Sequence, residues 1–105
     1  SFTSDYDSND GNVTITHESG DAIVATDVYF RGSNFWGSDR SNTTWANYSA
    51  DDNATISGEI EGQSAITAGD RAEFTASDSY ELRVVWESSE GDSSDTLLED
   101  TGPQA

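Results

Sequence analysis

The sequence contains four Asn-x-Ser/Thr triplets, the acceptor pattern for N-linked glycans. The acceptor side chains are Asn12, Asn42, Asn47 and Asn53, and three of the four triplets lie between residues 42 and 55. This is a modest excess over chance in a chain so rich in Ser and Thr. Glycan attachment requires an exposed segment of an exported protein. The pattern therefore predicts glycosylation at one or more of these sites, with accidental triplets in a polar loop as the alternative.

Three aromatic residues, Phe35, Trp36 and Trp45, lie in or next to the same segment. An exposed aromatic contact surface of this kind stacks sugar rings, which would indicate a carbohydrate-binding site. The alternative is that these side chains pack over one end of the fold or against a neighbouring subunit. We favour packing, because three nearby glycan acceptors would crowd a sugar-binding face.

Residues 5–11 (DYDSNDG) have the spacing of carboxylates found at the start of a calcium loop. An EF-hand loop requires Gly at its sixth position and a bidentate Glu at its twelfth, where this chain has Asp10 and Thr16. We therefore expect a solvated acidic turn and no metal or other cofactor.

The sequence offers few of the residue combinations that form catalytic sites. His17 is the only histidine and there is no cysteine, so neither a thiolate site nor a Ser/His/Asp triad is indicated. The 21 acidic residues offer many carboxylate pairs but none that stands out. We expect a structural role for His17, no catalytic residue, and a protein that is not an enzyme.

The charge balance is extreme: 21 acidic residues face four arginines and no lysine, for a formal net charge of −17. Such charge opposes compaction by self-repulsion, and molar salt screens that repulsion by shortening the Debye length to about 3 Å. The composition predicts a protein adapted to high salt. It also argues against nucleic acid and anionic membrane surfaces, which bind basic residues. Intrinsic disorder is the alternative, and eleven aromatic residues set in alternating runs argue against it.

The element that organises the chain is its closing stretch, residues 80–103. Tyr80, Leu82, Val84 and Trp86 alternate with polar residues, apart from Val85, as in a half-buried strand. Residues 88–94 supply a turn, and residues 95–100 form the return strand before Gly-Pro. This predicts a hairpin with Trp86 at the centre of the core.

Other segments supply the cover that this hairpin needs. Strands are predicted over residues 2–6, 13–17, 28–31, 54–61 and 71–76, with residues 62–69 as a connector anchored by Ile66 and a short edge strand or helical turn within 43–48. No window has helical periodicity. We predict one domain over 1–105, an all-β antiparallel sandwich of about seven or eight short strands. The covering core residues are Val13, Ile15, Val28, Phe30, Ile56, Ile60 and Phe74.

Several segments in order carry a family resemblance. They are residues 14–17 (TITH) followed by Gly20, Asp21 and Ile23, then 28–32 (VYFRG), 64–70 (SAITAGD), 80–87 (YELRVVWE) and 97–103 (LLEDTGP). In this acidic setting they resemble the soluble head domain of haloarchaeal type IV pilins, the subunits of adhesion pili. The resemblance implies an immunoglobulin-like all-β head carried on an N-terminal hydrophobic helix that packs into the filament. No such apolar run is present in residues 1–105, so we expect a processed form or a fragment of a longer pilin.

The expected function is that of a structural subunit of an extracellular, cell-surface type IV pilus-like filament, mediating adhesion or cell contact. The expected partners are other copies of the same subunit and surface or cell-envelope glycans, with no nucleic acid, and with a membrane only through the missing helix. The alternative is an extracellular carbohydrate-binding β-sandwich module of a halophilic protein. An apolar stretch of about twenty residues before Ser1 would favour the pilin, and a linker to a catalytic domain would favour the module.

Overall fold

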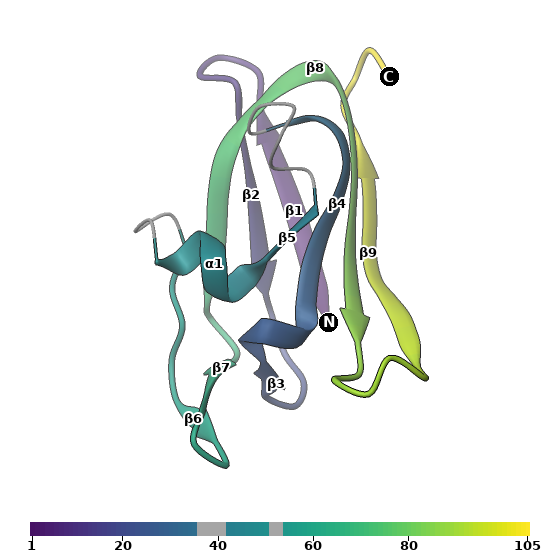
Figure 1. Cartoon of the computed structure of the whole chain (residues 1–105). Helices are drawn as coiled ribbons and strands as arrows, with labels where there is room; N and C mark the ends of the chain where they lie inside the picture. Colours follow the sequence, from purple (N-terminus) through teal and green to yellow (C-terminus); the bar gives the residue numbers. More distant parts are fainter. Residues whose placement is uncertain (36–41, 51–53) are drawn as a thin grey trace.

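The computed structural model of the protein describes residues 1–35, 42–50 and 54–105. It confirms an all-β fold with antiparallel pairing throughout (Figure 1). The described strands are β1 Phe2–Asp7, β2 Asn12–His17, β3 Ile23–Val24, β4 Val28–Phe35, β5 Asn42–Thr44, β6 Glu59–Ile60, β7 Gln63–Ile66, β8 Arg71–Glu87 and β9 Ser94–Thr101. Two short helical segments accompany them, the 3-10 turn η1 Ala25–Asp27 and the helix α1 Trp45–Ser49.

Strand β8 is 17 residues long and joins the two halves of a six-stranded sheet ordered β1-β2-β8-β4-β5, in which β9 also pairs with β8. Its first half pairs with β2, which pairs with β1. Its second half pairs with β4 on one side and β9 on the other. The strand arches over one end of the molecule between these halves (Figure 1). The two strands predicted at 71–76 and from 80 onward are therefore the halves of one bent strand, and each half pairs with different neighbours in the same sheet.

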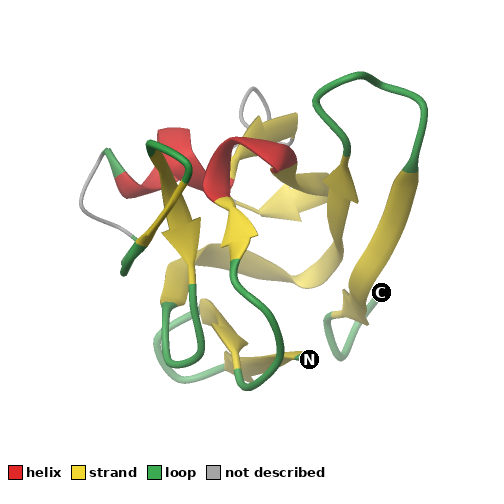
Figure 2. Cartoon of the chain, turned by 90° about the horizontal axis from the view of Figure 1, so that it is seen from below, coloured by secondary structure: helices red, strands yellow, loops and turns green. Residues whose placement is uncertain are grey.

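The hydrophobic core is built from side chains of both halves of this sheet, and Figure 2 shows the strands arranged around it. Phe30 of β4 and Phe74 of β8 meet with ring centroids 5.4 Å apart. Period two along the strands predicted this core because alternate side chains point to one face. Of the seven predicted covering residues, the structure buries five, namely Val13, Ile15, Val28, Phe30 and Phe74. The immunoglobulin-like sandwich stays a prediction.

The prediction of a continuous strand over residues 54–61 is wrong. Ala54 forms one isolated bridge with Ala72, and only Glu59–Ile60 joins a ladder, that of β7 in a small sheet ordered β3-β7-β6. In this segment the backbone nitrogen of Ser57 donates a hydrogen bond to the buried Asp70 carboxylate at 2.9 Å instead of to a neighbouring strand. The Ser57 hydroxyl Oγ also donates to this carboxylate, at 2.5 Å. Ile56 and Ile60 consequently remain only partly buried.

The connector predicted at 62–69 contains β7. Its anchor is confirmed, because Ile66 is fully buried. In the segment 43–48 the structure has both predicted alternatives, the edge strand β5 followed by α1. Thr44 caps this helix by accepting a hydrogen bond at Oγ1 from the backbone nitrogen of Asn47, at 3.1 Å.

Trp86 is not the centre of the core. It lies half-buried near the end of β8, whereas Trp45 of α1 is fully buried and packs on Phe30 at 5.4 Å between ring centroids. The hairpin itself is confirmed, with one β-bulge: Val84 pairs with Leu98 and Val85 with Thr96, which leaves Leu97 as the extra residue of β9.

Candidate functional site

The aromatic residues predicted to form a contact surface are mostly in the interior. Phe35 is 2% exposed and Trp45 is fully buried, and the indole nitrogen of Trp45 donates a hydrogen bond to the Thr55 carbonyl at 3.1 Å. Trp36 lies outside the described residues. Neither Phe35 nor Trp45 presents a ring to solvent, so the packing alternative describes both.

The glycan acceptors differ in accessibility. Asn47 is exposed on α1, and Asn12 is half-buried at the start of β2. The side chain of Asn42 and the whole of Asn53 lie outside the described residues. Asn47 is therefore the described acceptor best placed to carry a glycan.

The acidic segment 5–11 uses its carboxylates within a turn. Oδ1 of Asp7 accepts a hydrogen bond from the backbone nitrogen of Asn9 at 2.9 Å, and Oδ1 of Asp10 accepts one from that of Asn12 at 3.1 Å. Within 1–35, 42–50 and 54–105, no group of three or more His, Cys, Asp or Glu side chains is arranged to hold a metal ion. These carboxylates thus shape the β1–β2 connection.

His17 lies buried at the end of β2 and stacks on Phe2, with ring centroids 4.6 Å apart. Its Nε2 is 3.0 Å from the Asp21 carbonyl oxygen and its Nδ1 is 3.4 Å from that of Ser1. The imidazole therefore joins the start of β1 to the segment after β2, which is a structural position.

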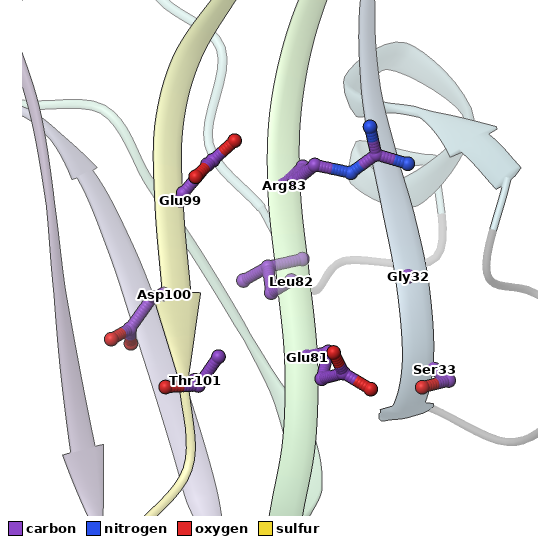
Figure 3. Close-up of a pocket in the computed structure, with 8 residues that line it drawn as sticks. All are labelled: Gly32, Ser33, Glu81, Leu82, Arg83, Glu99, Asp100 and Thr101. Carbon is purple, nitrogen blue, oxygen red and sulfur yellow. The ribbon is translucent and has the colours of Figure 1, made fainter. Parts of the chain in front are cut away.

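A shallow polar trough of about 550 Å³ crosses strands β4, β8 and β9 on the outer face of their sheet (Figure 3). Gly32 lies on the β4 side of it, next to Ser33, and Glu81 and Arg83 come from β8. The φ of Gly32 is +135°, which favours glycine. A Cβ built there would lie 2.0 Å from the Glu81 carbonyl oxygen.

The charges along this face are unevenly paired. Arg31 forms an ion pair with Glu87, Nη2 to Oε2 at 2.8 Å, and its guanidinium carbon lies 4.7 Å from the centre of the Tyr29 ring. Arg83 is directly opposite Arg31 across the β4–β8 ladder. In the described part of the chain, the Arg83 guanidinium makes no hydrogen bond or ion pair. In Figure 3 the Arg83 guanidinium reaches over β4.

The trough can therefore offer hydrogen-bond donors from Arg83 and acceptors from Glu81 and Glu99, together with the hydroxyls of Ser33 and Thr101. This set recognises hydroxyl-rich ligands or the polar surface of another protein. The sequence interpretation missed it. The available signal was Arg83, an arginine in an alternating strand of a chain with only four basic residues.

Two tyrosines bind carboxylates where β1, β8 and β9 approach one another. The Tyr6 hydroxyl donates to Oδ1 of Asp78 at 2.8 Å, and the Tyr80 hydroxyl donates to Oδ2 of Asp100. Burial, followed by this hydrogen bond, raises the pKa of Tyr80 well above its ordinary value. The hydrogen bond to Asp78 is the largest of the effects that raise the pKa of Tyr6. Both phenols are thus held protonated as donors.

Comparison with models of protein families finds no match to this chain, and comparison with curated proteins finds none either. Among the helices described, none is long and apolar enough to cross a membrane.

Proposed function

We propose that this chain is the head domain of a structural subunit of an extracellular type IV pilus-like filament, displayed at the cell surface for adhesion or cell contact. The observation that carries the proposal is where the resembling segments lie. Residues 28–32, 80–87 and 97–101 belong to β4, β8 and β9, which are neighbours in one sheet. Residues 14–17 lie in β2, which pairs with the other half of β8. Four of the segments thus form one connected frame.

The surface chemistry supports display in salt. The net charge is −17, and the described residues include no large hydrophobic side chain that is exposed. Such a surface stays solvated when charge repulsion is screened. The outer trough next to Arg83 supplies hydrogen-bonding groups for contact with surface glycans or with another subunit, and Asn47 supplies an exposed acceptor for a glycan of the filament itself.

The alternative prediction, a carbohydrate-binding module, depended on exposed rings of Phe35, Trp36 and Trp45. Two of these three are in the core, so replacing Trp45 would test stability before it tested sugar binding. The described residues therefore favour the filament subunit over the module.

Filaments sheared from cells that produce this chain test the proposal. Antibodies raised against the purified domain are expected to decorate the filaments in immunogold electron microscopy, and mass spectrometry of the filaments is expected to find peptides of residues 1–105. A strain with the gene deleted is the control for antibody specificity. Recovery of the chain only from the culture medium, bound to polysaccharide and absent from filaments, would overturn the proposal.

Glycosylation is tested by mass spectrometry of the same filament preparation. Glycopeptides containing Asn47 are expected in the filament digest, and their loss in an Asn47→Gln strain assigns the site. Unmodified peptides for every acceptor would contradict this part of the proposal while leaving filament membership standing.

A further inference from the structure

A second concavity, of about 390 Å³, lies at the end of the molecule that carries β3 and β6, where the β8–β9 connection also lies (Figure 1). The side chains that define it are Ile23, Asp27, Ile60, Trp86, Asp95 and Leu97. We call it the Trp86 groove. Volumes of this size accommodate a small organic ligand or one or two side chains.

The Trp86 groove gathers several partly exposed apolar side chains. Ile23, Trp86 and Leu97 pack against the core with one side and remain partly exposed. Ile60, on β6, is also partly exposed but is not packed against that core. The groove therefore lies between the small sheet and the turn end of the β8–β9 hairpin.

Two carboxylates, Asp27 of η1 and Asp95 of β9, line the groove together with Trp86. Asp95 is the direct partner of Trp86 on β9, and residues directly opposite in an antiparallel pair project to the same face. On the other side Trp86 pairs with Val28, and Asp27 immediately precedes Val28. Neither carboxylate makes a hydrogen bond or ion pair in the described part of the chain. Among the described residues that line the groove, none is basic.

An aromatic ring, aliphatic side chains and two unpaired carboxylates together complement a cation with apolar substituents. The ring quadrupole attracts the charge, the carboxylates neutralise it, and the aliphatic side chains cover the carbon atoms. The chain's net charge of −17 further concentrates cations at its surface. An anion would meet only like charge.

We propose that the Trp86 groove binds an organic ammonium ion whose alkyl groups rest on Trp86, Ile60 and Leu97 and whose charge lies beside Asp27 and Asp95. This site is independent of the filament function and of the polar trough. No covalent step is involved.

A pair of isosteric ligands tests the charge directly. Choline and its neutral carbon analogue 3,3-dimethyl-1-butanol are titrated into ¹⁵N-labelled protein, at the lowest NaCl concentration that keeps the spectrum of the folded domain. Choline is expected to shift the Trp86 indole signal and the amides of Asp95 and Leu97 saturably. The neutral analogue is expected to bind at least about tenfold more weakly, as the loss of a desolvated cation–π contact implies.

Variants locate the site. Asp27→Asn with Asp95→Asn is expected to weaken choline binding by about fivefold or more, in the range that paired charges near a surface provide. The matched control, Asp5→Asn with Glu73→Gln, removes the same charge from exposed positions of β1 and the first half of β8 and is expected to leave affinity unchanged. Trp86→Leu keeps an apolar side chain and removes the ring, so it is expected to weaken binding as well.

Three outcomes would overturn the proposal. Equal affinity for choline and its neutral analogue would indicate a purely apolar groove. Linear, unsaturated shifts spread over the acidic surface, unchanged in the Asp27/Asp95 variant, would indicate only a counterion atmosphere. Saturable shifts of the same signals with methyl β-D-glucopyranoside and none with choline would indicate a sugar site.

Discussion

At the scale of single residues, burial separates side chains that the sequence leaves alike. Trp45 lies between Thr44 and Ala46, whereas Trp86 ends the alternating run of residues 80–86, so period two favours Trp86 as the core residue. The fold places Trp45 inside instead, because a helix turn capped by Thr44 lays its side chain across Phe30. Trp86 lies beside the turn of the β8–β9 hairpin and remains half-buried. The position of a ring within an element, rather than its alternation, decides its role here.

The two tryptophans therefore differ in what they contribute to stability. Trp45→Ala is expected to lower the free energy of unfolding by about 3–5 kcal/mol, the cost of a large cavity in a core. Trp86→Ala is expected to cost about 1–2 kcal/mol, because less of its area leaves water on folding. Denaturant unfolding of both variants in the same salt measures this. An equal or larger loss for Trp86→Ala would contradict the arrangement of the core.

The Tyr80 phenol predicts an alkaline limit to stability. Its folded-state pKa is raised, so above about pH 10 the unfolded chain loses a proton that the folded chain retains. Stability from this group is complete below that pH and is lost as the pH rises. A fall of about 1 kcal/mol in the free energy of unfolding is expected between about pH 10 and 11 for one such group.

Tyr80→Phe is expected to flatten that dependence, as measured by denaturant unfolding at several pH values. Tyr29→Phe is the matched control, since its hydroxyl makes no hydrogen bond in the described part of the chain. It is expected to keep the slope of the unmodified protein. An unchanged slope in Tyr80→Phe would show that other groups set the alkaline limit.

At the scale of elements, alternation located most strands but not their connections. The apolar residues of β2, β4 and β8 predicted one buried face, and the structure buries them together. Alternation carries no signal for the bend that lets residues 71–87 form one strand whose halves pair with different neighbours. It also could not show that Asp70 takes the backbone of Ser57 away from a ladder, because that contact joins residues 13 positions apart. Of the candidate site residues, sequence identified the acceptor Asn47, whereas the trough and the Trp86 groove depend on register between distant strands.

Pairing of β4 with β8 depends on Gly32. Gly32→Ala is expected to lower the free energy of unfolding by about 3 kcal/mol or more, or to prevent folding, because its Cβ would meet the backbone of Glu81 and its φ disfavours any other residue. Gly62→Ala is the control: its φ is also positive, but no atom lies within 4 Å of the added carbon. A cost of about 1 kcal/mol is expected there. Circular dichroism and denaturant unfolding compare the two, and equal costs would show that φ alone matters at Gly32.

At the scale of the whole molecule, form and charge act together. The domain is elongated, 40 × 27 × 23 Å along its principal axes, with the turn between β1 and β2 and the C-terminus at one end and the Trp86 groove at the other (Figure 1). Its carboxylates cover a surface with few cations to pair with: Arg31–Glu87 is the only ion pair in the described part of the chain. Attraction between charges therefore contributes little to folding, while repulsion acts over the whole surface.

Salt is accordingly expected to control stability. The melting temperature should fall substantially as NaCl is reduced from about 3 M to about 0.1 M, where the Debye length lengthens to about 10 Å and repulsion between neighbouring carboxylates returns. Differential scanning calorimetry across this range measures the melting temperature.

Salt also strengthens the burial of apolar surface, so the effect of charge must be isolated. Replacing Glu59, Glu61, Glu73 and Glu90 by Gln changes the net charge from −17 to −13 at exposed positions. This variant is expected to melt higher than the unmodified protein in 0.1 M NaCl and at a similar temperature in 3 M NaCl. The same salt dependence in both proteins would show that apolar burial, and not charge repulsion, is what the salt acts upon.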